Sequence, residues 1–304
     1  MIEVAIMIEG QNGLNWPRWQ KLAKAAEELG FAGLYRSDHY TNANPPDKDS
    51  LELWVSLTWL ASHTSRIAFG PLVSPVSFRQ PTMTARMAAA VDDLSNGRLT
   101  LGLGAGWQER EHENYGWELL DLPERFARFE EGLTVITQLL KSDEPVFFNG
   151  RYYTVKEGMV LPRPKRPGGP PILIGGNGPK RTLPLVAKFA DEWNAVFISP
   201  DIFRERSRLL DEMLATNGRS PGDVRRSLMT RGQLGTDEQL ASQYKASLAE
   251  LREHGFVIGT PTAMVDQLGK WAEAGVQCIM LQWLDLDDLD GLETISSKVL
   301  SQLQ

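Results

Sequence analysis

Apolar runs that end abruptly in polar residues are the first sign of chemistry in this sequence. In FAGLYRSDHY, residues 31–40, the acid Asp38 stands next to the imidazole of His39. Imidazole titrates near neutral pH, so His39 could donate or accept a proton at little energetic cost. Asp38 could fix the tautomer of that ring or turn inward to brace a neighbouring loop. Without a place in a fold, the pair is better explained by a structural hydrogen bond.

A glycine-rich turn, ILIGGNGPKRTL at residues 172–183, could bind an anion. Glycines between a strand and a helix allow close backbone approach and present free amide groups to a ligand. We interpret the segment as a phosphate-binding turn, and the alternative is a tight turn whose basic residues are solvated. The spacing differs from both the Rossmann fingerprint and the P-loop. The residues concerned are Gly175, Gly176, Asn177, Gly178, Lys180 and Arg181.

A second glycine segment, GLGAGW at residues 102–107, ends another apolar run. It supplies Gly104, Ala105, Gly106 and Trp107. Small residues at the end of a strand let a flat ligand lie close to the backbone. We therefore expect this segment to contact such a ligand.

These motifs need a scaffold, and the sequence alternates strand-like and helix-like segments along most of its length. Strands are predicted at 4–9, 33–39, 66–73, 98–106, 171–176, 192–197, 224–235 and 277–284. Helices are predicted at 17–30, 51–62, 81–94, 124–141, 180–190, 200–216, 237–255 and 262–275. This alternation predicts an α/β fold, a closed parallel (β/α)8 TIM barrel, with an open doubly wound sheet as the alternative.

A segment of different texture interrupts the alternation between the fourth and fifth strands. Residues from about 143 to 170 combine aromatic alternation around Asn149-Gly150, a hairpin signal, with a proline-rich run that excludes helix. We predict an insertion of this segment into a single domain that spans residues 1–304.

In a β/α barrel, working side chains project from the C-terminal ends of the strands and from the loops that follow. This rule gathers the motifs at one end of the barrel, where catalysis becomes the better explanation of His39. It nominates Glu9, Gln11, Asp38, His39, 72–74, 104–108, 175–178, Phe197, Arg231, Gln233 and Gln282.

Composition argues against several other classes of protein. The single cysteine, Cys278, excludes a disulfide framework or a cysteine-based metal site within one chain, and the four histidines lack metal-binding spacing. We therefore predict no metal. A net charge of -7 without a long basic run argues against nucleic-acid binding. The sequence shows neither a signal peptide nor an apolar run of about 20 residues, which predicts a cytoplasmic protein without membrane contact.

Several segments together resemble the luciferase-like monooxygenase superfamily, and within it the branch that uses the deazaflavin coenzyme F-420. They occur in the same order over residues 1 to about 285, at 26–40, 65–116, 147–155, 170–194 and 259–282. The resemblance implies a β/α barrel with an insertion, forming a homodimer. It also implies a flavin or deazaflavin bound at the C-terminal end of the barrel, and a small-molecule substrate.

The resemblance also implies roles for single residues. By position, His39 is the imidazole that faces the reactive carbon of the ring, with the preceding aspartate beside it. Pro71, Leu72 and Val73 correspond to a bulge, often with a non-proline cis peptide, that backs the ring. The turn at 175–178 corresponds to the phosphate-binding turn, and the two basic residues after it would lie near the phosphate or the polyglutamate tail.

Two departures from the family pattern limit what the resemblance implies. The sugar-phosphate dehydrogenases of this branch carry a proton-donating glutamate where this chain has Trp107, and a tryptophan where it has Tyr40. The leading hypothesis is hydride transfer between F-420 and an organic substrate, with His39 as proton donor or polariser. The alternatives are an FMN-dependent monooxygenase supplied by a separate reductase and a non-catalytic carrier or sensor of the cofactor.

Overall fold

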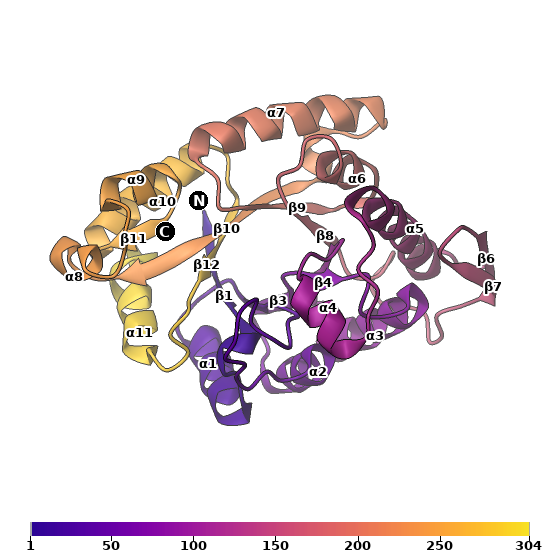
Figure 1. Ribbon diagram of the computed structural model, residues 1–304, viewed down its shortest axis with the longest axis horizontal. Helices are drawn as coiled ribbons and strands as arrows, with labels where there is room; N and C mark the ends of the chain where they lie inside the picture. The colour runs from indigo at the N-terminus through magenta and orange to yellow at the C-terminus, as the bar shows by residue number, and fades with distance from the viewer. Residues whose placement is uncertain (1, 304) are drawn as a thin grey trace.

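The computed structural model describes residues 2–303 as a barrel of parallel strands surrounded by helices (Figure 1). Neighbouring strands follow the order β3, β2, β1, β12, β10, β9, β8, β5 and β4. Their bounds are β1 Glu3–Ile8, β2 Gly33–Arg36, β3 Ala68–Pro71, β4 Ser74–Pro75, β5 Leu101–Gly104, β8 Ile172–Gly175, β9 Glu192–Val196, β10 Arg225–Leu234 and β12 Cys278–Gln282. The predicted barrel is confirmed, and the open doubly wound sheet is not the arrangement found.

The barrel closes between β3 and β5. Phe69 forms an isolated parallel bridge there, and the N–H of Thr100 donates to its carbonyl oxygen at 2.8 Å. The strand predicted over 66–73 is divided, because the chain bends after β3 and then pairs with β5 through β4. The peptide bond between Leu72 and Val73 in this bend is cis, as the resemblance implied.

Glycines make this closure possible. A Cβ atom at Gly70 would overlap the carbonyl oxygen of Thr100, and one at Gly102 would overlap the carbonyl oxygen of Pro71. Both neighbouring atoms belong to the backbone and cannot rotate away. The two strands therefore approach as closely as they do only because these positions carry no side chain.

Helices cover the outside of the barrel, and their sequences carry clear start signals. The side chain of Asn15 accepts the N–H of Arg18 at 3.2 Å and so caps α1, which has Pro17 in its first turn. The bounds are α1 Trp16–Glu28, α2 Leu53–His63, α3 Pro81–Leu94, α4 Glu109–Tyr115, α5 Leu122–Lys141, α6 Thr182–Phe189, α7 Pro200–Thr216, α8 Asp237–Ala241, α9 Leu248–Glu253, α10 Pro261–Glu273 and α11 Leu289–Lys298. Three short 3-10 helices lie at Gly10–Asn12, Pro221–Asp223 and Leu300–Gln302.

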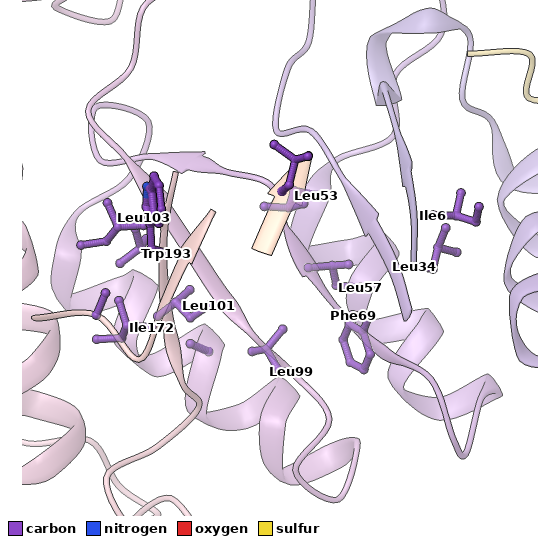
Figure 2. Packing of buried hydrophobic residues seen from close by; sticks show 14 of the residues in the cluster. Ile6, Leu34, Leu53, Leu57, Phe69, Leu99, Leu101, Leu103, Ile172 and Trp193 are labelled. Atoms are coloured by element: carbon purple, nitrogen blue, oxygen red, sulfur yellow. The ribbon is translucent and has the colours of Figure 1, made fainter. Parts of the chain in front are cut away.

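Two hydrophobic layers stabilise the barrel. The larger layer lies between the strands and the helices, where Ile6, Leu34 and Phe69 come from neighbouring strands and Leu57 comes from α2 (Figure 2). The smaller layer fills the inside of the barrel with Ala5, Met7, Tyr35, Leu72, Leu173, Met229, Cys278 and Met280. Because side chains alternate between these layers along each strand, the interior is packed and the open space lies at its end.

The structure differs from the prediction in the segment after β10. The helix predicted over 237–255 consists of two short helices, α8 and α9, because Thr236 and Ser247 each start one with a capping box. A short strand, β11 (Val257–Gly259), follows and pairs with the end of β10. The helix α4 was also not predicted.

The predicted insertion contains the expected hairpin. Strands β6 (Val146–Asn149) and β7 (Thr154–Gly158) pair antiparallel around the predicted turn and project from the barrel at the right edge of Figure 1. Within residues 2–303, no helix has the length and hydropathy that crossing a membrane requires.

Candidate functional site

A cavity of about 440 Å³ opens at the C-terminal end of the barrel strands, and we call it the central cavity. Its floor is apolar, with the thioethers of Met7 and Met229, and polar side chains surround it. Its lining residues are Met7, Glu9, Gln11, Ser37, His39, Leu72, Val73, Pro75, Gly106, Trp107, Gly175, Gly176, Asn194, Val196, Phe197, Met229 and Gln282. Most of the residues nominated from the strand ends are therefore brought together here.

His39 lies in the wall of the central cavity with a fixed ring orientation. Its Nδ1–H donates to Oε2 of Glu111 at 2.8 Å, and the edge of its ring meets Trp107, with 5.6 Å between the ring centroids. No hydrogen bond to Nε2 occurs within residues 2–303. The second nitrogen of the ring is thus left for a ligand in the cavity.

Glu111 holds that orientation from a fully buried position on α4. Its Oε1 accepts the backbone N–H groups of Tyr40 and Thr41, and its Oε2 also receives Nε2 of Gln108 at 3.4 Å. Sequence analysis missed this residue. The segment EREHENY is strongly polar, and nothing in it separates Glu111 from the exposed Glu109 and Glu113.

The surroundings shift the pKa values of two histidines in opposite directions. Burial acts to lower the pKa of His39, but the hydrogen bond and charge of Glu111, helped by Glu9 and Asp38, raise it above the ordinary 6.5. Burial lowers the pKa of His112, whose Nε2 accepts the hydroxyl of Ser77. The ring in the cavity is therefore the one whose protonated form is favoured by its surroundings.

Asp38 turns away from the central cavity and braces a loop, which is one of the two roles left open by the sequence. Its carboxylate pairs with Arg79 and accepts the hydroxyl of Ser74 at 2.7 Å. Arg79 also donates to the hydroxyl of Tyr40 and to Glu52, each at 2.8 Å. Asp38 thus acts on His39 through charge and loop position, without a hydrogen bond to the ring.

Polar groups at the ends of β1 and β12, the next strands around the barrel from β2, continue the wall. Glu9 accepts Nε2 of Gln282 at 2.6 Å and Nε2 of Gln11 at 2.9 Å. Oε1 of Gln282 is buried without a hydrogen-bond partner, and so is Oδ1 of Asn194, whose amide donates to Ser227. Two lining residues therefore each carry a buried acceptor to which no group within residues 2–303 donates.

Three glycines from two motifs surround Val73 of the cavity floor. Cβ atoms at Gly102, Gly104 and Gly175 would each crowd its side chain. Gly104 and its neighbour Ala105 are not among the lining residues, so the small residue at Gly104 makes room for Val73 rather than for a ligand. Gly106 and Trp107 do line the cavity, and Trp107 is 61% exposed.

The glycine turn after β8 has protein acceptors for only some of its backbone N–H groups. The N–H of Gly176 donates to the carbonyl oxygen of Asn194, and the side chain of Asn177 forms hydrogen bonds with the backbone of Val196. In the described residues, no protein acceptor receives the N–H groups of 177, 178, 180 and 181. Gly175 and Gly176 reach the central cavity, whereas Asn177, Gly178, Lys180 and Arg181 lie beyond it, with both basic side chains exposed.

Pro71 is buried behind the wall of the central cavity. Arg231 and Gln233 line a separate cavity of about 480 Å³ beside the central cavity. No group of three or more His, Cys, Asp or Glu side chains that could hold a metal ion occurs among residues 2–303.

Comparison with known proteins shows what the chain is similar to. A family model described as luciferase-like monooxygenase matches residues 3–255. An F-420-dependent glucose-6-phosphate dehydrogenase of Microbacterium testaceum is 32% identical over 66% of this chain and 59% of its own length. Another, from Kineococcus radiotolerans, is 32% identical over 68% of this chain. The chain matches about three fifths of the length of these curated relatives.

Solved structures share the fold. An F-420-dependent secondary alcohol dehydrogenase in complex with an F-420-acetone adduct has a TM-score of 0.84 at 18% identity, and the match covers 99% of this chain and 98% of the other.

Proposed function

Because the chain belongs to the luciferase-like monooxygenase family, we propose that it is an oxidoreductase that moves a hydride between coenzyme F-420 and an organic substrate. The observation that carries the proposal is His39, whose ring lines the central cavity with Nδ1 fixed by Glu111 and Nε2 left for a ligand. The names of several relatives as F-420-dependent enzymes support the choice of cofactor.

The residues present fit a deazaflavin. The buried acceptors Oδ1 of Asn194 and Oε1 of Gln282 need donors, and the ring N–H and the hydroxyls of the side chain of a deazaflavin are donors. The free amides of the turn at 175–178, with Lys180 and Arg181, suit the phosphate. We propose that Pro71, Leu72 and Val73 back the ring, and that Gly106 and Trp107 border it.

When bound, the cofactor supplies a ring carbon that carries the hydride. The chain positions the substrate and manages its proton. With Nδ1 held by Glu111, a protonated His39 presents Nε2–H to a substrate oxygen and stabilises negative charge that develops there. From behind the cavity wall, the negative charge of Asp38 favours the protonated imidazole ring of His39. Trp107 has no titratable proton, so His39 is the single proton donor where the sugar-phosphate dehydrogenases of this branch have two such groups.

Binding and turnover test this proposal separately. We expect F-420 to bind more tightly than FMN when each is titrated with purified protein and the fluorescence of the ligand is followed. We expect His39→Ala to retain F-420 binding within about threefold while losing at least about a hundredfold in turnover, because a positioned acid contributes on the order of 10²–10⁴.

Three results would contradict it. Tighter binding of FMN with oxygen-dependent turnover would favour the FMN-dependent monooxygenase, supplied by a separate reductase. Unchanged turnover in His39→Ala would favour a non-catalytic carrier. Binding of neither ligand would remove the cofactor assignment.

The homodimer and the cytoplasmic location remain proposals. Light scattering would test the first, because a dimer has twice the 34.0 kDa of the chain.

A further inference from the structure

A second cavity of about 480 Å³ lies at the same end of the barrel as the central cavity, and we call it the side cavity. It is enclosed by the end of β10, the link between α8 and α9, and the loop after β12. Its lining residues are Arg231, Gly232, Gln233, Leu234, Gln243, Tyr244, Trp283, Leu284, Asp285 and Asp288. The function proposed above uses none of them.

Arg231 is a cation without a protein partner in this cavity. Its Nε is buried and accepted by no group, and no ion pair of Arg231 occurs within residues 2–303. Burial lowers its pKa, while Tyr244 and Glu9 raise it through charge. A guanidinium carries five donors that match a carboxylate or a phosphate, and a buried Nε–H without an acceptor is costly.

The acids near Arg231 are occupied elsewhere. Asp288 accepts the N–H of Gly291 and caps α11, and Asp285 accepts the N–H of Asp287 in a turn. Glu9 is bonded to Gln282 and Gln11.

The polar groups around Arg231 are likewise bonded to one another. The hydroxyl of Tyr244 donates to Gln233, whose amide donates to Gln243 at 2.7 Å. Arg231 is therefore the side chain of the side cavity whose hydrogen-bond donors are free for a ligand.

The side cavity adjoins the central cavity. Arg231 is the register partner of Gln282, which lines the central cavity, and Trp283, the next residue, lines the side cavity. Arg231 also follows Met229 of the central floor by two residues, so both side chains leave the same face of β10. A molecule in one cavity can thus extend into the other.

We propose that the side cavity is a subsite for an anionic group, a carboxylate or a phosphate, of the organic substrate, and that Arg231 pairs with it. This inference deepens the proposed function and rests on it for the reaction. The anion of the cofactor has a different place, because the glycine turn follows β8, and β9 separates β8 from β10. Trp283 and Leu234 give the subsite an apolar side that suits the carbon skeleton attached to the anion.

The test uses benzoate and inorganic phosphate as probes on the full chain without cofactor, with calorimetry and ligand-observed NMR. We expect Arg231→Ala to weaken benzoate binding at least tenfold and Arg231→Lys to weaken it less. The control Lys245→Ala removes an exposed cation from the link between α8 and α9 and should change binding less than twofold. Because Arg231 has no protein partner, thermal melting of the variants should match that of the wild type.

A second arm separates the two sources of the anion. F-420 and the deazaflavin that lacks its phosphate and tail are titrated into wild type and Arg231→Ala. We expect the variant to bind both as the wild type does. Weaker binding of F-420 alone would assign the side cavity to the cofactor tail and overturn the substrate subsite. Absence of saturable benzoate and phosphate binding by the wild type, or binding insensitive to Arg231, would also overturn it, whereas failure of F-420 itself to bind would count against the proposed function.

Discussion

At the scale of single residues, the site depends on a histidine whose two nitrogens have different tasks. Glu111 accepts a hydrogen bond from Nδ1–H at a position without solvent exposure, so turning the ring of His39 would remove a hydrogen bond from a buried carboxylate. The same carboxylate is fixed by two backbone N–H groups. Proton transfer at Nε2 is therefore coupled to the fold of the segment after β2.

Substituting Glu111 should move the titration of His39. We expect Glu111→Gln to lower the pKa of His39, because the amide keeps the size of the side chain but removes the charge that opposes burial. NMR titration of carbon-labelled histidine measures this directly. Glu113→Gln, an exposed neighbour on α4, is the matched control. An unchanged His39 titration in Glu111→Gln would show that the carboxylate does not set its protonation.

The same shift has a consequence for stability. A folded-state pKa above 6.5 means that the contribution of His39 is fully present below pH 6.5 and is lost as pH rises through the folded pKa. We therefore expect the difference in free energy of unfolding between wild type and Glu111→Gln, measured with urea, to shrink across that window.

At the scale of elements, the loop after β8 should distinguish cofactors by their phosphate. We expect the double substitution Lys180→Ala with Arg181→Ala to weaken F-420 binding by about tenfold or more, since charge-assisted contacts are each worth about 1.5–3 kcal/mol. The deazaflavin without phosphate and tail should bind unchanged. Lys21→Ala, exposed on α1, serves as control. Equal loss for both ligands would mean that the turn does not bind the phosphate.

Much of this arrangement was predictable because the pattern of each strand is local. Every barrel strand except β4 overlaps a predicted strand, and the rule that polar residues at its C-terminal end form the site placed His39, Trp107 and Gln282 in one cavity. Glu111 was not predictable, because its burial results from the packing of α4 against the segment after β2. The role of Asp38 depended on where Arg79, 41 residues away, would lie.

The chain between β10 and β11 was also beyond prediction as one element. Its composition favours helix, but Thr236 and Ser247 each cap the start of a separate helix. Only the fold brings Tyr244 against the end of β10.

At the scale of the whole molecule, closure of the barrel depends on contact between β3 and β5. We expect Gly102→Ala to destabilise the protein by about 1–3 kcal/mol, because its methyl group would meet the carbonyl oxygen of Pro71. Gly269→Ala is the matched control, since nothing lies near that position in α10, and it should stabilise by about 0.5–1 kcal/mol. Urea unfolding compares them. Similar changes in the free energy of unfolding for both variants would show that the contact between β3 and β5 tolerates a wider spacing.

The apolar floor of the central cavity would also be chemically changed by any peroxide formed there. Thioethers react with peroxide to form sulfoxides, which are polar and add 1 oxygen atom each. Met7 and Met229 line the space where a reduced cofactor would meet oxygen, while Met280 is packed in the layer beneath. Peroxide released in the central cavity would therefore meet these two thioethers and leave polar sulfoxides in the apolar floor.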